Sequence, residues 1–272
     1  MASSTKNIFQ YRELIAALAW KNIVIRYKQA YLGILWAVLK PLMLMMIFTL
    51  VRSFVGIESG DVPYPILTFA ALLPWVFFQE SASEGVNSVT SNAALIKKIY
   101  FPREVFPLTA MATKLVELAI SFVILAGMMV YYKMMPTIYA FWVPAIVFYT
   151  MIVALTISFF GAALNVYYRD VSQALPVALS LLMYGSPVIY PLSLVHKKLI
   201  VEQAAGEWSE RLYTLYTLNP MAGIIDAFQN VMLKGLPPDL NALYPGAILT
   251  FIILPFSYWY FKRAENWFAD VI

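Results

Sequence analysis

Cysteine is absent from this sequence, and histidine occurs once, at His196. These absences exclude disulfides, thiolate metal sites and sites built from several histidines. Charged residues are also scarce: they form 12% of the chain, against about 25% in soluble domains. Hydrophobic residues form 61% of it. This balance excludes an ordinary soluble domain and predicts a membrane protein.

Motifs for enzymatic chemistry are absent too. No glycine is followed by lysine, so the loop that cradles nucleotide phosphates in many ATPases cannot form. The HExxH and GxSxG patterns of common hydrolases are missing as well. No basic folded domain indicates nucleic-acid binding. We therefore expect no catalytic residues and no metal or cofactor on this chain, which leaves transport, channel or scaffold roles.

Six apolar segments approach the roughly 20 residues that span a bilayer. The fifth is short and contains Pro176, Gly185 and Pro187, as do segments that break within a membrane. The sequence predicts an all-α integral membrane protein with about six transmembrane helices. They cover residues 32–55, 64–83, 108–132, 138–166, 175–190 and 243–261.

The distribution of Lys and Arg predicts the orientation. With an even number of spans both termini lie on one side, and most of the cations fall on that side. Because cytoplasmic loops carry an excess of Lys and Arg, we expect both termini in the cytoplasm. The chain then divides into a cytoplasmic N-terminal part (1–31), a transmembrane domain (32–263) with an outer loop (191–242), and a cytoplasmic tail (264–272).

The N-terminal part contains an amphipathic segment. One helical face is apolar and the rest is charged, which is typical of a helix that lies in the membrane interface. Packing of the apolar face on another protein is the alternative. The apolar face comprises Ile8, Tyr11, Leu14, Ile15 and Leu18, and the charges are Arg12, Glu13 and Lys21.

A second amphipathic helix is predicted in the outer loop. Asn219 is a favoured N-cap, Pro220 fits the first helical position, and Lys234 followed by Gly235 resembles a helix stop. The loop is too short to enclose a large core of its own, so we expect a small cap on the outer membrane face. The apolar stripe comprises Met221, Ile224, Ile225, Phe228, Val231 and Met232.

Four ionisable residues lie near the inner ends of the second and third predicted spans. Glu80 and Glu84 are four residues apart, and Lys114 and Glu117 are three apart, so each pair lies on one helical face. Charges within a membrane are costly and indicate function, such as ion-coupled transport. The alternative is solvation near the cytoplasmic boundary, with a local ion pair between Lys114 and Glu117.

The segment LIKKIYFPREVFP, residues 95–107, separates the second span from the third. The positive-inside rule explains its cations but not its aromatic residues and prolines. Aromatic and arginine side chains are typical of protein-binding hot spots, and Asn92 is placed to cap a short helix. We therefore interpret this segment as a cytoplasmic docking element.

Together these features resemble the ABC-2 type permeases that export bacterial polysaccharides, particularly the O-antigen and teichoic-acid exporters. The resemblance covers nearly the whole chain. Its motifs, in order, are RYKQAYLGILWAVLKPL at 26–42, LLPWVFF at 72–78, NAALIKKIYFPREVFPL at 92–108, NVYYRDV at 165–171, SPVIYP at 186–191 and LNPM at 218–221.

The resemblance implies a permease subunit of the bacterial inner membrane that moves lipid-linked polysaccharide outward. Its partners would be a second copy of itself, two ATP-binding cassette subunits that hold ATP and Mg, the lipid-linked polysaccharide and membrane lipids. An ABC-2 exporter of a drug or small lipid is the nearest alternative. An ion-coupled transporter and a non-transporting scaffold are the others.

The resemblance also implies roles for particular residues. The segment after the second span would be the coupling helix that docks into the ATPase subunit, through Leu95, Lys97, Lys98, Tyr100, Phe101, Arg103 and Glu104. Arg26, Lys28 and Lys40 would receive the pyrophosphate of the substrate, although contact with anionic lipid explains the same cations. Tyr and Trp rings suit sugars, and we expect Trp36, Trp75, Phe77 and Tyr149 to line the path. Met221, Ile225 and Phe228 would form an outer gate.

Overall fold

The computed structural model describes residues 10–28, 33–56, 62–98, 101–201 and 207–271, and this part of the chain is built from helices without strands. Five helices are long and apolar enough to cross a membrane. The predicted all-α membrane fold is therefore confirmed. These helices are α3 (Trp36–Val55), α4 (Tyr64–Ser91), α6 (Val105–Tyr131), α7 (Val143–Tyr167), which follows the 3-10 helix Ile138–Trp142, and α12 (Leu240–Glu265).

The fifth predicted span is a shorter helix, α8 (Val171–Tyr184). Its 14 residues extend only about 21 Å at 1.5 Å per residue, less than the roughly 30 Å of bilayer hydrocarbon. The helix stops at Tyr184, before Pro187, because proline lacks the N–H that a helix needs. A turn-rich stretch over residues 185–191 then continues the chain.

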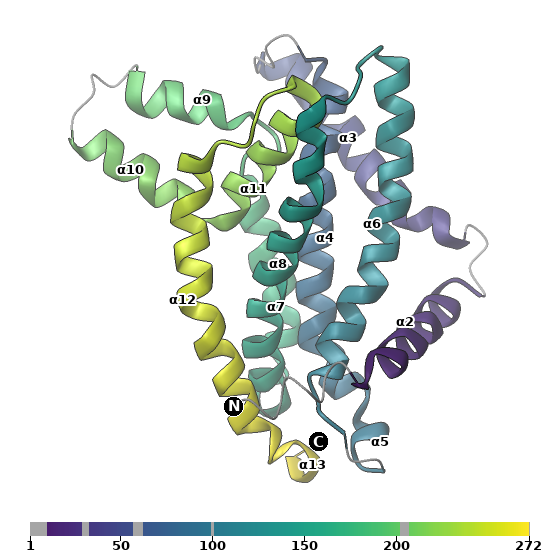
Figure 1. Cartoon of the computed structure of the whole chain (residues 1–272). Coiled ribbons are helices and arrows are strands. Elements are labelled where there is room, and N and C mark those ends of the chain that lie inside the picture. The colour runs from purple at the N-terminus through teal and green to yellow at the C-terminus, as the bar shows by residue number, and fades with distance from the viewer. Residues whose placement is uncertain (1–9, 29–32, 57–61, 99–100, 202–206, 272) are drawn as a thin grey trace.

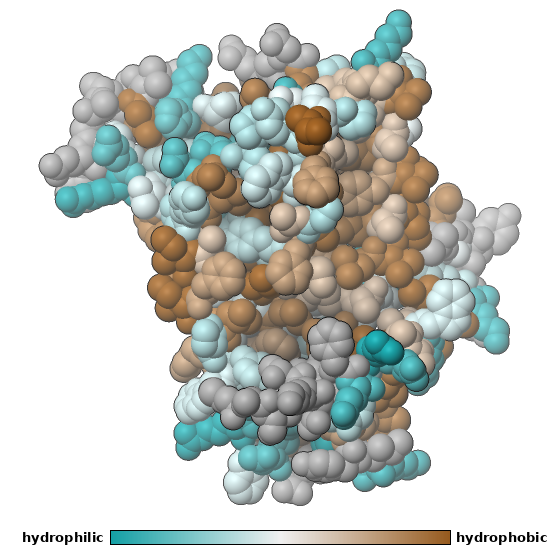
Figure 2. All heavy atoms as spheres, in the orientation of Figure 1, coloured by the Kyte–Doolittle hydropathy of each residue, from teal (hydrophilic) through white to brown (hydrophobic). Residues whose placement is uncertain are grey.

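The bundle has two distinct ends (Figure 1). At one end, here the α5 end, lie α2 (Arg12–Tyr27), α5 (Ala93–Ile96) and α13 (Phe268–Val271). At the other, the α9 end, lie α9 (Leu192–His196) and α10 (Glu207–Thr217). Figure 2 shows a broad hydrophobic belt between them, with hydrophilic residues gathered toward both ends. This distribution matches a bundle that crosses a membrane.

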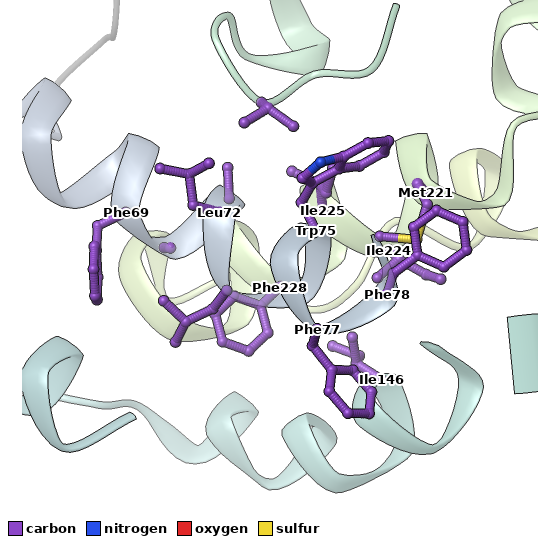
Figure 3. Packing of buried hydrophobic residues seen from close by; sticks show 14 of the residues in the cluster. Phe69, Leu72, Trp75, Phe77, Phe78, Ile146, Met221, Ile224, Ile225 and Phe228 are labelled. Carbon is purple, nitrogen blue, oxygen red and sulfur yellow. The ribbon is translucent and has the colours of Figure 1, made fainter. Parts of the chain in front are cut away.

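α4 forms the centre of the bundle. It packs on α3, α6, α7, α8 and α11, and nearly all of its side chains between Tyr64 and Phe78 are buried. A helix that is apolar on all sides favours such a central position. Figure 3 shows Trp75 and Phe78 of this helix close to residues of α11, and Phe77 close to Ile146 of α7.

α11 (Pro220–Gln229) corrects the expectation of a cap on the membrane face. The N-cap prediction is confirmed, since Asn219 Oδ1 accepts a hydrogen bond from the Met221 N–H at 3.1 Å. The helix, however, is buried on every side and packs on α4, α7 and α12. Its polar face is buried as well: Gln229 donates to the Leu67 carbonyl at 3.1 Å.

Glycine permits the close approach of α11 to α12. A Cβ on Gly223 would lie 2.4 Å from the Ala242 carbonyl oxygen, and a Cβ on Gly246 would lie 2.5 Å from Pro220 Cα. Real Cβ atoms do not approach backbone so closely, so any side chain here would push the two helices apart. The close contact holds α11 inside the bundle.

α2 packs obliquely on the bundle at the α5 end (Figure 1). Four of the five residues of its predicted apolar face pack on a second hydrophobic cluster, and Ile8 lies outside the described residues. This face therefore contacts the same chain and is half-buried there. Trp20 and Ile25 instead are exposed, at 68% and 64%. The packed residues are Tyr11, Leu14, Ile15 and Leu18.

Candidate functional site

Six charged side chains from four helices meet near the α5 end of the bundle. We call them the charge cluster; it holds three cations and three carboxylates. α2 contributes one residue, α3 one, and α4 and α6 two each. The members are Arg26 of α2, Lys40 of α3, Glu80 and Glu84 of α4, and Lys114 and Glu117 of α6.

Lys114 lies at the centre of the charge cluster. Its Nζ is 2.8 Å from Glu80 Oε2, 2.9 Å from Glu84 Oε1 and 2.9 Å from Glu117 Oε2. Only 2% of the side chain is exposed, and a charge buried this deeply needs close partners. The helical spacings of four residues on α4 and three on α6 aim these groups at one point. The predicted ion pair between Lys114 and Glu117 is thus confirmed, whereas solvation of Lys114 is wrong.

Arg26 and Lys40 form the outer layer of the charge cluster. Arg26 pairs with Glu84 and, at 2.8 Å, with Glu117, and Lys40 pairs with Glu80. These two cations are 36% and 48% exposed. Burial by itself lowers the pKa of Arg26, but the two carboxylates outweigh it and raise that pKa above its ordinary value. Arg26 therefore stays charged at every physiological pH.

Tyr27 joins the charge cluster without being predicted. Its hydroxyl donates to Glu117 Oε1 at 2.9 Å. Burial and the neighbouring Glu117 carboxylate raise the pKa of Tyr27 to about 12, so it remains a neutral donor. Nothing in its sequence position distinguishes it, except that it follows Arg26 at the end of an amphipathic helix.

A cavity of about 260 Å³ lies against the exposed side of the charge cluster. Its polar lining is charged apart from the neutral Tyr27 hydroxyl, and Trp36, which is 53% exposed, also lines it. Arg26 and Lys40, two of the three cations expected to receive a pyrophosphate, thus line one cavity. Lys28 is exposed and does not line this cavity. The lining comprises Arg26, Tyr27, Trp36, Ala37, Lys40, Val76, Glu80, Lys114 and Glu117.

The predicted coupling segment divides into a buried part and an exposed part. Phe101, Arg103 and Glu104 are buried at 4%, 7% and 0% exposure, so they form no free docking surface, which corrects the prediction for these three. Lys97 and Lys98 are exposed, Leu95 is half-buried, and Tyr100 lies outside the described residues.

The buried part of the coupling segment is tied to α12. Glu104 Oε1 accepts from the Tyr258 hydroxyl at 3.0 Å and pairs with Lys262 at 2.9 Å. The backbone N–H of Arg103 donates to Glu265 Oε1 at 2.9 Å. These contacts link the start of α6 to the end of the last long helix. The predicted cap is wrong, because the Asn92 amide donates to the Ser88 carbonyl at 2.8 Å and does not cap α5.

The predicted path-lining aromatics are in different environments. Trp75 and Phe77 are 0% and 4% exposed and pack inside the core of this chain (Figure 3), so neither ring faces a path in this conformation. Tyr149 is half-buried and packs against the same core. Trp36 is the exposed member of the set, and it lines the cavity at the charge cluster.

The predicted gate residues are also core residues. Met221, Ile225 and Phe228 are at most 1% exposed, and the Phe228 ring lies 5.6 Å from that of Phe122 in α6. Gating by these residues therefore requires α11 to move together with the helices on which it packs.

Comparison with known proteins places the chain in a family. Residues 13–233 match the ABC-2 type transporter family. The chain is 27% identical to the "O-antigen export system permease protein RfbA" of Myxococcus xanthus, over 100% of both chains. It is 26% identical to a protein of the same name from Klebsiella pneumoniae, over 96% of this chain and 95% of that one. This chain belongs to the ABC-2 type transporter family.

Proposed function

We propose that this chain is the permease subunit of an ATP-driven exporter that moves lipid-linked, O-antigen-like polysaccharide across the bacterial inner membrane. End-to-end similarity to proteins named as O-antigen export permeases carries this proposal. A multi-pass bundle without a phosphate-binding loop supports it, since such a chain needs a separate source of energy. ATP and Mg bind a partner subunit, and this chain catalyses no reaction.

In this proposal the α5 end faces the cytoplasm, with both termini. Lys97 and Lys98 of the coupling segment are exposed there, within reach of a cytoplasmic ATPase. Two ATPase subunits dock on two copies of the permease, one on each coupling segment. A homodimer is favoured because five long helices and one shorter helix are few to enclose a polymer on their own.

The transport cycle has three steps. The lipid-linked glycan reaches the exposed cations Arg26 and Lys40 from the inner leaflet. Closure of the ATPase subunits moves the coupling segment, and the contacts of Arg103 and Glu104 carry that movement to α12. α12 in turn displaces α11, on which it packs at Gly223, and opens a path between the two copies.

The exposed lysines of the coupling segment provide a direct test. Lys97→Glu together with Lys98→Glu reverses the charge of the docking surface without touching the buried Phe101 or Glu104. We expect both co-purification of the ATPase subunit and surface polysaccharide to fall at least tenfold in a complemented deletion strain. Lys133→Glu is the matched control, since Lys133 is exposed at the opposite end of α6.

The two measurements separate the parts of the proposal. Normal ATPase binding and normal surface polysaccharide in the double variant would reject the coupling assignment. Normal surface polysaccharide in the deletion strain itself would reject the export function.

A further inference from the structure

The short helix α5 of the coupling segment cannot hold its position alone. It has four residues, and isolated helices shorter than about 12 residues are marginal in water. Within the described part of the chain, no side chain caps its N-terminus. Ile96, which is 3% exposed, is the residue that it buries. The position of α5 therefore depends on what packs around Ile96 and on the residues that follow.

α13, which follows α12, packs on α5. Both helices lie at the α5 end of the bundle (Figure 1), and α13 contacts α5 and α7. Phe268 of α13 is 0% exposed and belongs to the same hydrophobic cluster as Ile96 and Phe101. The centroid of its ring lies 5.5 Å from that of Phe261 in α12. α13 thus supplies a buried aromatic anchor to the cluster that holds both sides of the coupling segment.

Polar contacts extend this attachment along the end of α12. Glu104 pairs with Lys262 at 2.9 Å, and three residues after that lysine Glu265 accepts from the Arg103 N–H at 2.9 Å. Phe268, three residues further on, joins the cluster that includes apolar residues preceding Arg103. The partners thus move backward along the coupling segment as the chain moves forward from α12 to α13. The two stretches therefore run antiparallel and are joined by successive contacts.

The exposed lysines of the coupling segment lie between two buried anchors. Lys97 and Lys98 are exposed, Ile96 precedes them, and Phe101 follows at 4% exposure. Burial of Ile96 and Phe101 fixes the backbone on either side of the lysines. A surface held in its bound arrangement loses less conformational entropy on binding, and so it binds more tightly. Support of these anchors therefore affects how well the lysines can meet a partner.

We propose that α13 positions the coupling segment for the ATPase subunit, with Phe268 holding α5 in its docking arrangement. The proposal rests on the proposed function and deepens it by adding a positioning element for the same partner. Because Phe268 is fully buried, it acts through α5 and does not touch the ATPase. Trp267 is the neighbouring residue, but it is 60% exposed and lies outside the cluster.

Spin-label mobility on α5 tests this positioning directly. The chain has no cysteine, so a single introduced cysteine carries the label. Ala94→Cys puts it on an exposed residue of α5, and Met135→Cys puts a reference label in the loop after α6, at the α9 end. In the full-length permease in nanodiscs, we expect Phe268→Ala to raise the mobile fraction of the label at position 94 severalfold. The label at position 135 should stay unchanged.

Binding of the ATP-binding cassette subunit that co-purifies with the permease is the second readout. If Phe268→Ala leaves α5 in its docking arrangement about one tenth of the time, the apparent affinity falls about tenfold. Phe268→Leu keeps an apolar anchor and should retain most of the affinity and most of the label order. Trp267→Ala, at the exposed neighbour, is the matched control and should change neither readout.

Three results would overturn the proposal. The first is an unchanged label at position 94 or an unchanged affinity in Phe268→Ala. The second is equal mobilisation of both labels, which would indicate a general loss of packing. The third is a loss of affinity in Trp267→Ala as large as that in Phe268→Ala, since α13 would then contact the ATPase itself.

The label measurement also separates this proposal from the proposed function, because it needs the permease alone. If no ATPase subunit co-purifies with the native chain, the proposed function fails. The labels at positions 94 and 135 would then still decide whether Phe268 holds α5 in place.

Discussion

Replacing Lys114 with methionine removes the cation that three carboxylates share. Methionine fills a similar volume, so the change leaves no large cavity, and its effect is electrostatic. In the native chain, three cations balance three carboxylates. In the variant, Glu80, Glu84 and Glu117 share only Arg26 and Lys40. Breaking a buried ion pair from one side costs about 3–5 kcal/mol, and we expect a loss of stability in that range.

Unfolding in detergent micelles by increasing dodecyl sulfate, followed by tryptophan fluorescence, measures this loss. Lys28→Met, at an exposed lysine at the end of α2, is the matched control and should change stability little. Adding Glu117→Gln to Lys114→Met removes the surplus carboxylate, so the double variant should recover part of the loss. A Lys114→Met variant as stable as the control, or a double variant less stable than the single one, would show that Lys114 does not stabilise the fold by balancing these carboxylates.

Two further predictions concern α11. Gly223→Val adds a side chain where even a Cβ would lie 2.4 Å from the Ala242 carbonyl oxygen. We expect about 1–3 kcal/mol of destabilisation from overpacking and loss of export. Unchanged unfolding would show that α11 and α12 are not in close contact. Asn219→Ala removes the acceptor of the Met221 N–H and should cost about 1 kcal/mol or more in the same unfolding assay. Asn219→Asp keeps that acceptor but loses the amide N–H that donates to Ser186 Oγ at 2.8 Å, so it should lose less stability than Asn219→Ala without being neutral. Equal stability of the Ala and Asp variants would contradict the capping role.

Local chemistry and hydrophobic length are what a sequence predicts well in this protein. Five of the six apolar segments are long helices. A long run of apolar residues favours the membrane whatever it packs against, so this property can be predicted from the local sequence alone. Asn219 followed by Pro220 is equally local, and the cap forms as predicted. Lys114 and Glu117 are three residues apart on one helix, so their pairing follows from the helical period.

Contacts between distant segments are what the same reasoning misses. Outside its apolar stripe α11 carries the polar residue Gln229, and a polar side chain there predicts a face exposed to solvent. In the structure the Leu67 carbonyl of α4 accepts a hydrogen bond from Gln229, and the helix is buried. From the sequence, Glu104 is predicted to be a docking residue. In the structure it is bound by Tyr258 and Lys262 of α12, which are more than 150 residues away in the sequence. The charge cluster depends likewise on four helices whose order in space no local pattern specifies.

Transport in proteoliposomes tests whether this permease depends on a separate ATP-binding subunit for its energy. Vesicles carry the permease alone, or the permease with its ATP-binding subunit, and the movement of a polyprenyl-diphosphate-linked glycan across the bilayer is followed with and without ATP. We expect transport against a gradient only when both subunits and ATP are present. Uphill transport by the permease alone would contradict it, as would a complete complex that hydrolyses ATP and moves no glycan.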